Sequence, residues 1–340
     1  MRLQASILLT SLILIATLQS TIIYVQCINN KLIIVTSIET LSLIAKEIGG
    51  DKLEVHTLLP EEAEPHAIQF TPKMLELIRN ASLLILTGHF EFENELISTV
   101  NIPYVSLNDY VAHGLKLLEI PDNGINVHGY WLHPTNAIAI AEAIVEKLRK
   151  IDPVNGDYYT MKLNEFKLRV NKFLSNVNSS LIENYGLNWI EVVVAFPAAQ
   201  YVLEALQMKI GAFLSKGHEA FVGGSELARI EEKLKRREYK LIVCPDIIMK
   251  TQLSDYVKQI SKDTGAPIAL IKTIGGKEFT SYVELISYNF GVIIGALSAS
   301  SFAEPSEARG FTHLDVMLII VSLVLAIIAT IEAWVIIGRI

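Results

Sequence analysis

Short runs of β-branched and aliphatic residues alternate along the chain with longer stretches whose apolar positions recur at helical spacing. The run 31–36 predicts a strand, and Ile38 to Ile48 predicts a helix that Gly49 and Gly50 end. Thr71 and Pro72 are typical of a helix N-cap and first helical position. Further strands are predicted over 53–59, 82–87 and 102–107, and a helix over 136–150. This alternation predicts a parallel sheet with helical crossovers.

One long helix is predicted between this region and a second one of the same kind. Residues 155–183 contain no proline and read as a single helix. Beyond it, strands are predicted over 191–195, 241–244 and 268–271, and helices over 198–208, 251–264 and 282–297. We expect an α/β protein with two lobes, each with a parallel-type sheet flanked by helices, joined by one long helix. Ligands in such folds bind at the carboxyl ends of strands, here in a cleft between the lobes.

The two ends of the chain are strongly apolar. Residues 3–30 carry no charged side chain, and with Arg2 before them they resemble a secretory signal peptide or signal anchor. Near the other end, Val316 to Ile337 is long enough for one transmembrane helix. We therefore expect a large extracellular part on a single-pass C-terminal anchor in the cell membrane. The expected segments are a signal segment 1–30, an N-terminal lobe 31–152, a connecting helix 153–186, a C-terminal lobe 187–297, a stalk 298–314 and a transmembrane helix 315–338.

Composition and motifs exclude several classes of protein. The formal net charge is −7 and no sustained basic stripe is present, so we expect no binding to nucleic acid. Two cysteines exclude a disulfide scaffold. Gly-x-Ser-x-Gly, phosphate-binding glycine loops and His-Glu-x-x-His are absent, so we expect no enzyme.

Histidines mark the candidate chemistry. They follow predicted strands or precede the helix at 136, and neutral imidazole is a frequent zinc ligand. An acidic run at Glu61, Glu62 and Glu64 would also attract a cation. The candidate metal ligands are His66, His89, His128 and His133.

The chain resembles a known family in five motifs, which together cover residues 31 to about 297. These are Val35-Thr-Ser, Leu43-Ile-Ala-Lys-Glu-Ile-Gly-Gly-Asp51, Pro65-His66-Ala-Ile-Gln-Phe-Thr71-Pro72, Trp131-Leu-His-Pro-Thr-Asn136-Ala and Ser281-Tyr282-Val-Glu-Leu-Ile-Ser-Tyr-Asn289. They resemble the solute-binding proteins of zinc and manganese ABC importers, the cluster A-I type. The resemblance implies a rigid two-lobed receptor that delivers one divalent cation to a membrane permease powered by a cytoplasmic ATPase.

The resemblance also implies about four side-chain ligands between the lobes, and this chain departs from that pattern. His66 occupies the position of the first ligand. The second falls on Gly129, with His128 one residue away and His133 as the weaker alternative. The third falls on Phe196 and the fourth near Lys272, neither of which suits a cation.

Replacement ligands must therefore come from elsewhere, and His89 is the candidate, because it lies at a strand end beside the His66 loop. Two or three histidines favour zinc over manganese. We expect a monomeric, membrane-anchored receptor whose divalent cation, zinc before manganese, passes to an ABC permease. Two alternatives stay open: the same fold with a changed ligand or an interaction role, and a metal-dependent enzyme.

Overall fold

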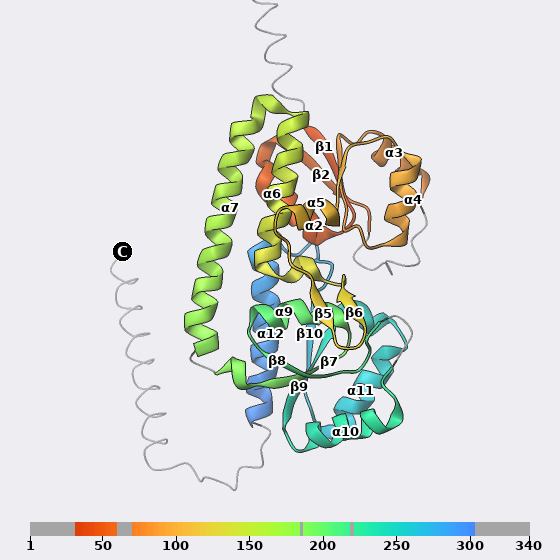
Figure 1. Ribbon diagram of the computed structural model, residues 1–340, viewed down its shortest axis with the longest axis vertical. Coiled ribbons are helices and arrows are strands. Elements are labelled where there is room, and N and C mark those ends of the chain that lie inside the picture. The colour runs from red at the N-terminus through yellow and green to blue at the C-terminus, as the bar shows by residue number, and fades with distance from the viewer. Residues whose placement is uncertain (1–30, 60–69, 184–185, 218–220, 303–340) are drawn as a thin grey trace, which may run out of the picture. The chain divides into compact units, whose positions relative to one another are not determined.

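Two parallel sheets form the framework of the protein (Figure 1). The computed structural model describes residues 31–59, 70–183, 186–217 and 221–302. Within them, the first sheet has the order β2-β1-β3-β4, built from β1 (Leu32–Thr36), β2 (Leu53–Thr57), β3 (Leu83–Ile85) and β4 (Tyr104–Val105). The second has the order β10-β9-β7-β8, built from β7 (Glu191–Val194), β8 (Lys209–Phe213), β9 (Tyr239–Pro245) and β10 (Ile268–Ile271). The paired strands of both sheets run parallel, as the alternating pattern predicts.

Helices cover the first sheet. They are α2 (Glu39–Gly49), α3 (Pro72–Arg79), α4 (Glu91–Thr99), α5 (Leu107–Ala112) and α6 (Pro134–Ile151). The predicted start of α3 is confirmed, because the Thr71 hydroxyl accepts a hydrogen bond from the Met74 amide at 3.2 Å and Pro72 opens the helix. The strand predicted over 102–107 is wrong beyond Val105. Ser106 instead begins α5, with its amide donating to the Asp109 carboxylate at 2.9 Å.

The long helix is α7 (Gly156–Val177), which runs beside α6 (Figure 1) and continues as a π-helical turn over Asn178–Ile182. Beyond it lie α9 (Gln200–Ala205), α10 (Gly224–Lys235), α11 (Leu253–Thr264) and α12 (Tyr282–Phe302). The helix predicted over 198–208 is shorter, because the chain turns after α9 with Gln207 at a φ of 54°. An antiparallel hairpin of β5 (Leu118–Ile120) and β6 (Gly124–Asn126) has no counterpart among the predicted elements.

Short helical turns connect these elements. They are η1 (Gly50–Lys52), η2 (Tyr130–Leu132), η3 (Pro153–Asn155), η5 (Leu187–Trp189), η6 (Pro197–Ala199) and η7 (Asp246–Lys250). Two of them lie at the carboxyl edge of the second sheet: η7 begins directly after β9, and η6 follows the end of β7 after two further residues.

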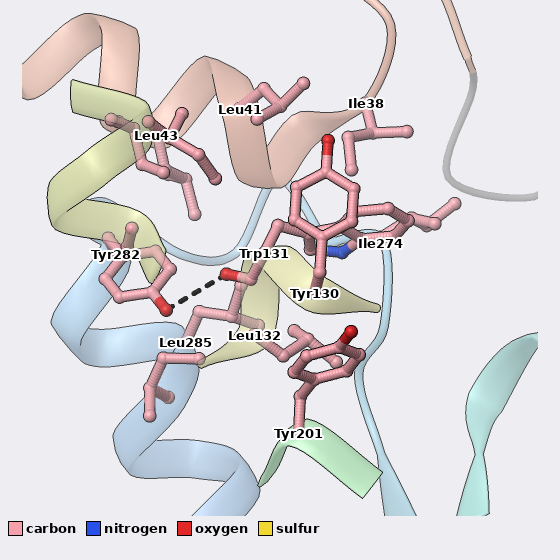
Figure 2. Close-up of a cluster of buried hydrophobic side chains, with 14 of the residues drawn as sticks. Ile38, Leu41, Leu43, Tyr130, Trp131, Leu132, Tyr201, Ile274, Tyr282 and Leu285 are labelled. Carbon is pink, nitrogen blue, oxygen red and sulfur yellow. Dashed lines mark hydrogen bonds between the residues drawn. The ribbon is translucent and has the colours of Figure 1, made fainter. Parts of the chain in front are cut away.

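One apolar core runs through both sheets and the helices between them. Figure 2 shows its centre, where η2 contributes Trp131, and Tyr282 and Leu285 come from α12. The Tyr282 hydroxyl donates to the Trp131 carbonyl at 3.0 Å (Figure 2). The Trp131 indole donates to the Thr273 carbonyl at 2.7 Å. A second cluster of buried residues packs on the other face of the second sheet, against α10 and α11. The two sheets are therefore joined by packed side chains as well as by α7.

Most of the two apolar ends of the chain lies outside the described residues. The structure divides into two units, Met1–Leu297 and Ser298–Ile340. The signal segment 1–30, the transmembrane helix 315–338, most of the stalk and His66 lie outside the described residues. Residues 298–302, which we assigned to the stalk, are helical as the end of α12. In the described part, Tyr282–Ala299 of α12 is long and apolar enough to cross a membrane, but Tyr282, Leu285 and Phe290 pack in the core.

Candidate metal centre

His89 lies just beyond β3, in a loop held by a buried carboxylate. Glu93, in the first turn of α4, is fully buried. It accepts hydrogen bonds from the Thr87 amide at 2.7 Å, the Thr87 hydroxyl at 2.8 Å, the His89 amide at 2.9 Å and the Phe90 amide at 3.2 Å. A carboxylate at a helix N-terminus is also favoured by the helix dipole. The hydrogen bonds to Glu93 therefore fix the backbone that carries His89.

His128 is positioned by Asn126, the last residue of β6. The buried Asn126 side chain accepts a hydrogen bond from the His128 amide at 2.9 Å. Its amide group donates to the Pro197 carbonyl and to the Gln200 side chain, both at 2.9 Å. Asn126 thus joins the hairpin to the turn that follows β7, and the same residue that orients His128 also binds the second lobe.

The two imidazoles meet. The ring centroids of His89 and His128 are 4.5 Å apart and the rings are nearly perpendicular, at 88°. On its other side His128 lies against Phe196, with ring centroids 5.1 Å apart. Within the described ranges no group of three or more His, Cys, Asp or Glu side chains forms a metal-binding arrangement. The structure brings two of the four predicted ligands together, and His66 lies outside the described residues.

Gly129 explains why the ligand position is shifted by one residue. Its φ is +76°, and a Cβ at this position would lie 2.6 Å from the Ala198 carbonyl oxygen. The backbone of the second lobe fills the space that a side chain would need. Residue 129 therefore has no room for a side chain, and the neighbouring His128 is the one that contacts His89.

His133 has a structural role. It is the N-cap of α6, and its Nδ1 accepts a hydrogen bond from the Thr135 amide at 3.2 Å. Burial, with a smaller contribution from the positive charge of Lys116, lowers the pKa of His133 to about 4. The ring is neutral at pH 7, but one of its two nitrogens already binds the helix.

The second lobe places Phe196, Asp246 and Lys272 at the carboxyl edge of its sheet. Phe196 follows β7 and is 5% exposed. Lys272 follows β10, and its ammonium group lies 3.2 Å from Glu278 Oε1 and 3.8 Å from Asp246 Oδ2. Asp246, directly after β9, also accepts a hydrogen bond from the Thr273 amide at 3.1 Å. Burial raises the pKa of Asp246, opposed by that hydrogen bond and by the charge of Lys272.

Asp246 and Glu278 are not among the residues that the sequence predicts to lie at the site. Asp246 carries a signal that we used for the histidines, because it stands immediately after a predicted strand, at 241–244. Glu278 lies in a loop, and nothing in the sequence pattern links it to the cleft.

Residues 34–296 match the model of one protein family, described as the zinc-uptake complex component A, periplasmic (ZnuA). The chain belongs to this family. Its members are substrate-binding components of metal ABC importers and are not enzymes, which confirms the resemblance seen in the five motifs.

Relatives and solved structures agree with the assignment. The chain is 25% identical over 287 residues to the manganese ABC transporter substrate-binding lipoprotein PsaA of Streptococcus mitis, covering 79% of this chain and 90% of that protein. It is 24% identical over 296 residues to a metal ABC transporter substrate-binding lipoprotein of Lactococcus lactis, covering 80% and 90%.

Two solved structures share the fold. A crystal structure of ZnuA matches with a TM-score of 0.62 at 20% identity, covering 80% of this chain and 99% of that one. FpvC of Pseudomonas aeruginosa in complex with Ni²⁺ matches with a TM-score of 0.64 at 22% identity, covering 80% and 98%. The predicted α/β class is therefore confirmed by the sheets described above and by these neighbours.

Proposed function

We propose that this protein is an extracellular, membrane-anchored receptor that captures zinc in the cleft between its lobes and delivers it to an ABC permease and its ATPase. Membership of the family supports the general role of a metal-binding importer component. The names of the relatives include manganese as well as zinc, so the choice of zinc depends on the side chains of this chain.

The observation that carries the proposal is the contact between His89 and His128. Two imidazoles with ring centroids 4.5 Å apart can bind one cation together after a small rotation about their side-chain bonds. Both backbones donate hydrogen bonds to buried side chains, Glu93 and Asn126, so the pair is preorganised for binding. His66, from the Pro-His motif, is the third proposed ligand, and His133 is the weaker alternative.

The donor set favours zinc. Imidazole nitrogen suits zinc, whereas manganese prefers oxygen ligands. Phe196 offers no oxygen donor where the second lobe faces His128. The remaining coordination position would be filled by water.

A transmembrane anchor would hold the receptor at the membrane that contains its permease. With one span over Val316 to Ile337, the receptor would stay on the same membrane as its permease. Tethering raises the effective concentration of the receptor at its partner without any further contact.

Metal titration tests the proposal directly. The full-length protein in detergent is stripped with a chelator and titrated with zinc and with manganese, beside His66→Ala, His89→Ala and His128→Ala. We expect one zinc per chain, manganese bound at least tenfold more weakly, and a loss of zinc affinity of about 100-fold or more in the His128 variant. His56→Ala, on the exposed side of β2, is the matched control and should bind as wild type does.

A second candidate function is favoured by Phe196 and Lys272, which occupy two positions where the family resemblance implies ligands. In that case the cleft binds a different solute. Wild-type protein that binds neither cation, or that binds one with an affinity indifferent to all three histidines, would contradict the zinc receptor and favour this alternative.

A further inference from the structure

Three residues form a row along the carboxyl edge of the second sheet. Val194 of β7 pairs with Val243 of β9, and Ile271 of β10 pairs with Pro245 of β9. The residues that follow these strands therefore stand side by side in the order Phe196, Asp246 and Lys272. Because the His128 ring contacts Phe196, the row starts at the pair of imidazoles. Neighbouring strands are about 4.8 Å apart, so the backbone of Lys272 is about 10 Å from that of Phe196.

Lys272 is an internal cation in this row. Its side chain is 24% exposed, and its ammonium group lies between Glu278 at 3.2 Å and Asp246 at 3.8 Å. The backbone of Lys272 is held separately. Its amide donates to the Asn289 side chain, and its carbonyl accepts from the same side chain, both at 2.8 Å. The charge of Lys272 can therefore be removed without removing the hydrogen bonds that fix β10 to α12.

Lys272 offsets half of the negative charge at this edge. Asp246 and Glu278 supply two negative charges, and Lys272 supplies one positive charge. Without the ammonium group, two unpaired carboxylates would remain near Phe196, whose ring contacts His128. Carboxylate oxygens are zinc ligands as well as long-range attractors of a cation.

We propose that Lys272 sets how tightly the cleft holds its divalent cation, because its ammonium group occupies the carboxylates of Asp246 and Glu278. The inference rests on the proposed function and concerns the regulation of the same site. A receptor must release its metal ion to the permease. By pairing with Asp246 and Glu278, the Lys272 ammonium group prevents the second lobe from binding the metal ion too tightly. Lys272 is thus a residue that determines affinity, whereas His89 and His128 are ligands.

The experiment compares zinc binding by the full-length protein in detergent with that of Lys272→Met. If the ammonium group and the cation are separated by about two strand spacings, or about 10 Å, removing the unit charge at an effective dielectric constant between those of protein and water corresponds to about tenfold in affinity. We expect Lys272→Met to bind zinc at least tenfold more tightly than wild type. Lys258→Met, which removes the same charge from an exposed position on α11 of the same lobe, should change the affinity less than twofold.

A second variant identifies the cause. In Lys272→Met/Asp246→Asn the gain should fall to a third or less, because one of the released carboxylates is lost. Thermal melting of each variant confirms that it is folded.

The outcomes separate the two proposals. A tighter Lys272→Met that depends on Asp246 supports the inference. An unchanged or weaker affinity in Lys272→Met, with zinc binding still lost in His128→Ala, overturns the inference and leaves the zinc receptor standing. Failure of wild type and of Lys272→Met to bind any cation overturns both.

Discussion

The two lobes differ in the side chains that they bring to the contact between His128 and Phe196. The first lobe supplies His89 and His128 and fixes each of them through a buried side chain, Glu93 or Asn126. The second lobe supplies Phe196 and a lysine whose charge is already matched by two carboxylates. The two lobes therefore place different chemical groups around the same contact: two imidazoles from the first, and an aromatic ring and paired charges from the second.

Removing the support of His89 should have the largest effect. In Glu93→Gln, an amide group replaces an oxygen that accepts hydrogen bonds, and its hydrogens then face the donors of Thr87, His89 or Phe90. We expect a loss of about 3 kcal/mol in the free energy of unfolding. Denaturant unfolding measures it, and Glu91→Gln, exposed at the start of the same helix, should change it by less than about 0.5 kcal/mol. Equal effects in both variants would show that the buried carboxylate does not hold the loop.

The close approach of the lobes at Gly129 should have the next largest effect. Gly129→Ala places a Cβ 2.6 Å from the Ala198 carbonyl oxygen and strains a residue with positive φ, so we expect about 2 kcal/mol of destabilisation. Gly124→Ala is the matched control, because its φ is +82° and nothing lies within 4 Å of its Cβ. The difference in unfolding free energy between the two variants isolates the contact between the lobes, and no difference would argue against it.

Giving the second lobe a ligand should reduce the asymmetry. The ring of Phe196 lies 5.1 Å from that of His128, so Phe196→His places a further imidazole beside the pair. We expect zinc affinity to rise about tenfold, or about 1.4 kcal/mol, when measured by competition with a chelating dye. Phe221→His, at an exposed position of the same lobe, serves as the control. Unchanged affinity would mean that position 196 does not face the bound cation.

The last predicted effect is absent at neutral pH and appears only in acid. The pKa of His133 is about 4 in the folded protein, against an ordinary value of 6.5, so at intermediate pH the unfolded chain binds a proton that the folded chain does not. Stability is therefore unaffected above pH 6.5 and falls as the pH is lowered, by about 2 kcal/mol near pH 5 and about 3 kcal/mol near pH 4. His133→Asn keeps an N-cap residue and should flatten this part of the stability profile, as followed by urea unfolding at several pH values. A profile as steep as that of wild type would refute the assignment.

The sequence predicts the fold better than it predicts the site. Periodicity and cap residues such as Thr71 are local signals, and they locate most strands and helices. The β5–β6 hairpin was missed because its strands are too short to show an alternating pattern. His89 is predicted from its place after a strand and His128 from its place before the helix at 136, but their contact depends on the β5–β6 hairpin that precedes His128. The roles of Glu93 and Asn126 depend on hydrogen bonds that only the folded chain reveals.

Asp246 shows what the position of a residue after a strand does not reveal. It stands after a strand just as His89 does, but its relation to Lys272 depends on the order β10-β9-β7-β8, which cannot be read from one strand at a time. Charges that neutralise each other across neighbouring strands are therefore easily overlooked in a sequence.

The apolar core shared by the two sheets has a consequence for how the molecule melts. Trp131 and Tyr282 tie segments from opposite halves of the chain into one packed cluster. A boundary of this kind leaves neither half a complete core of its own, so the halves lose their structure together. A single heat-absorption peak, with equal calorimetric and van't Hoff enthalpies, is the behaviour that follows for residues 31–297.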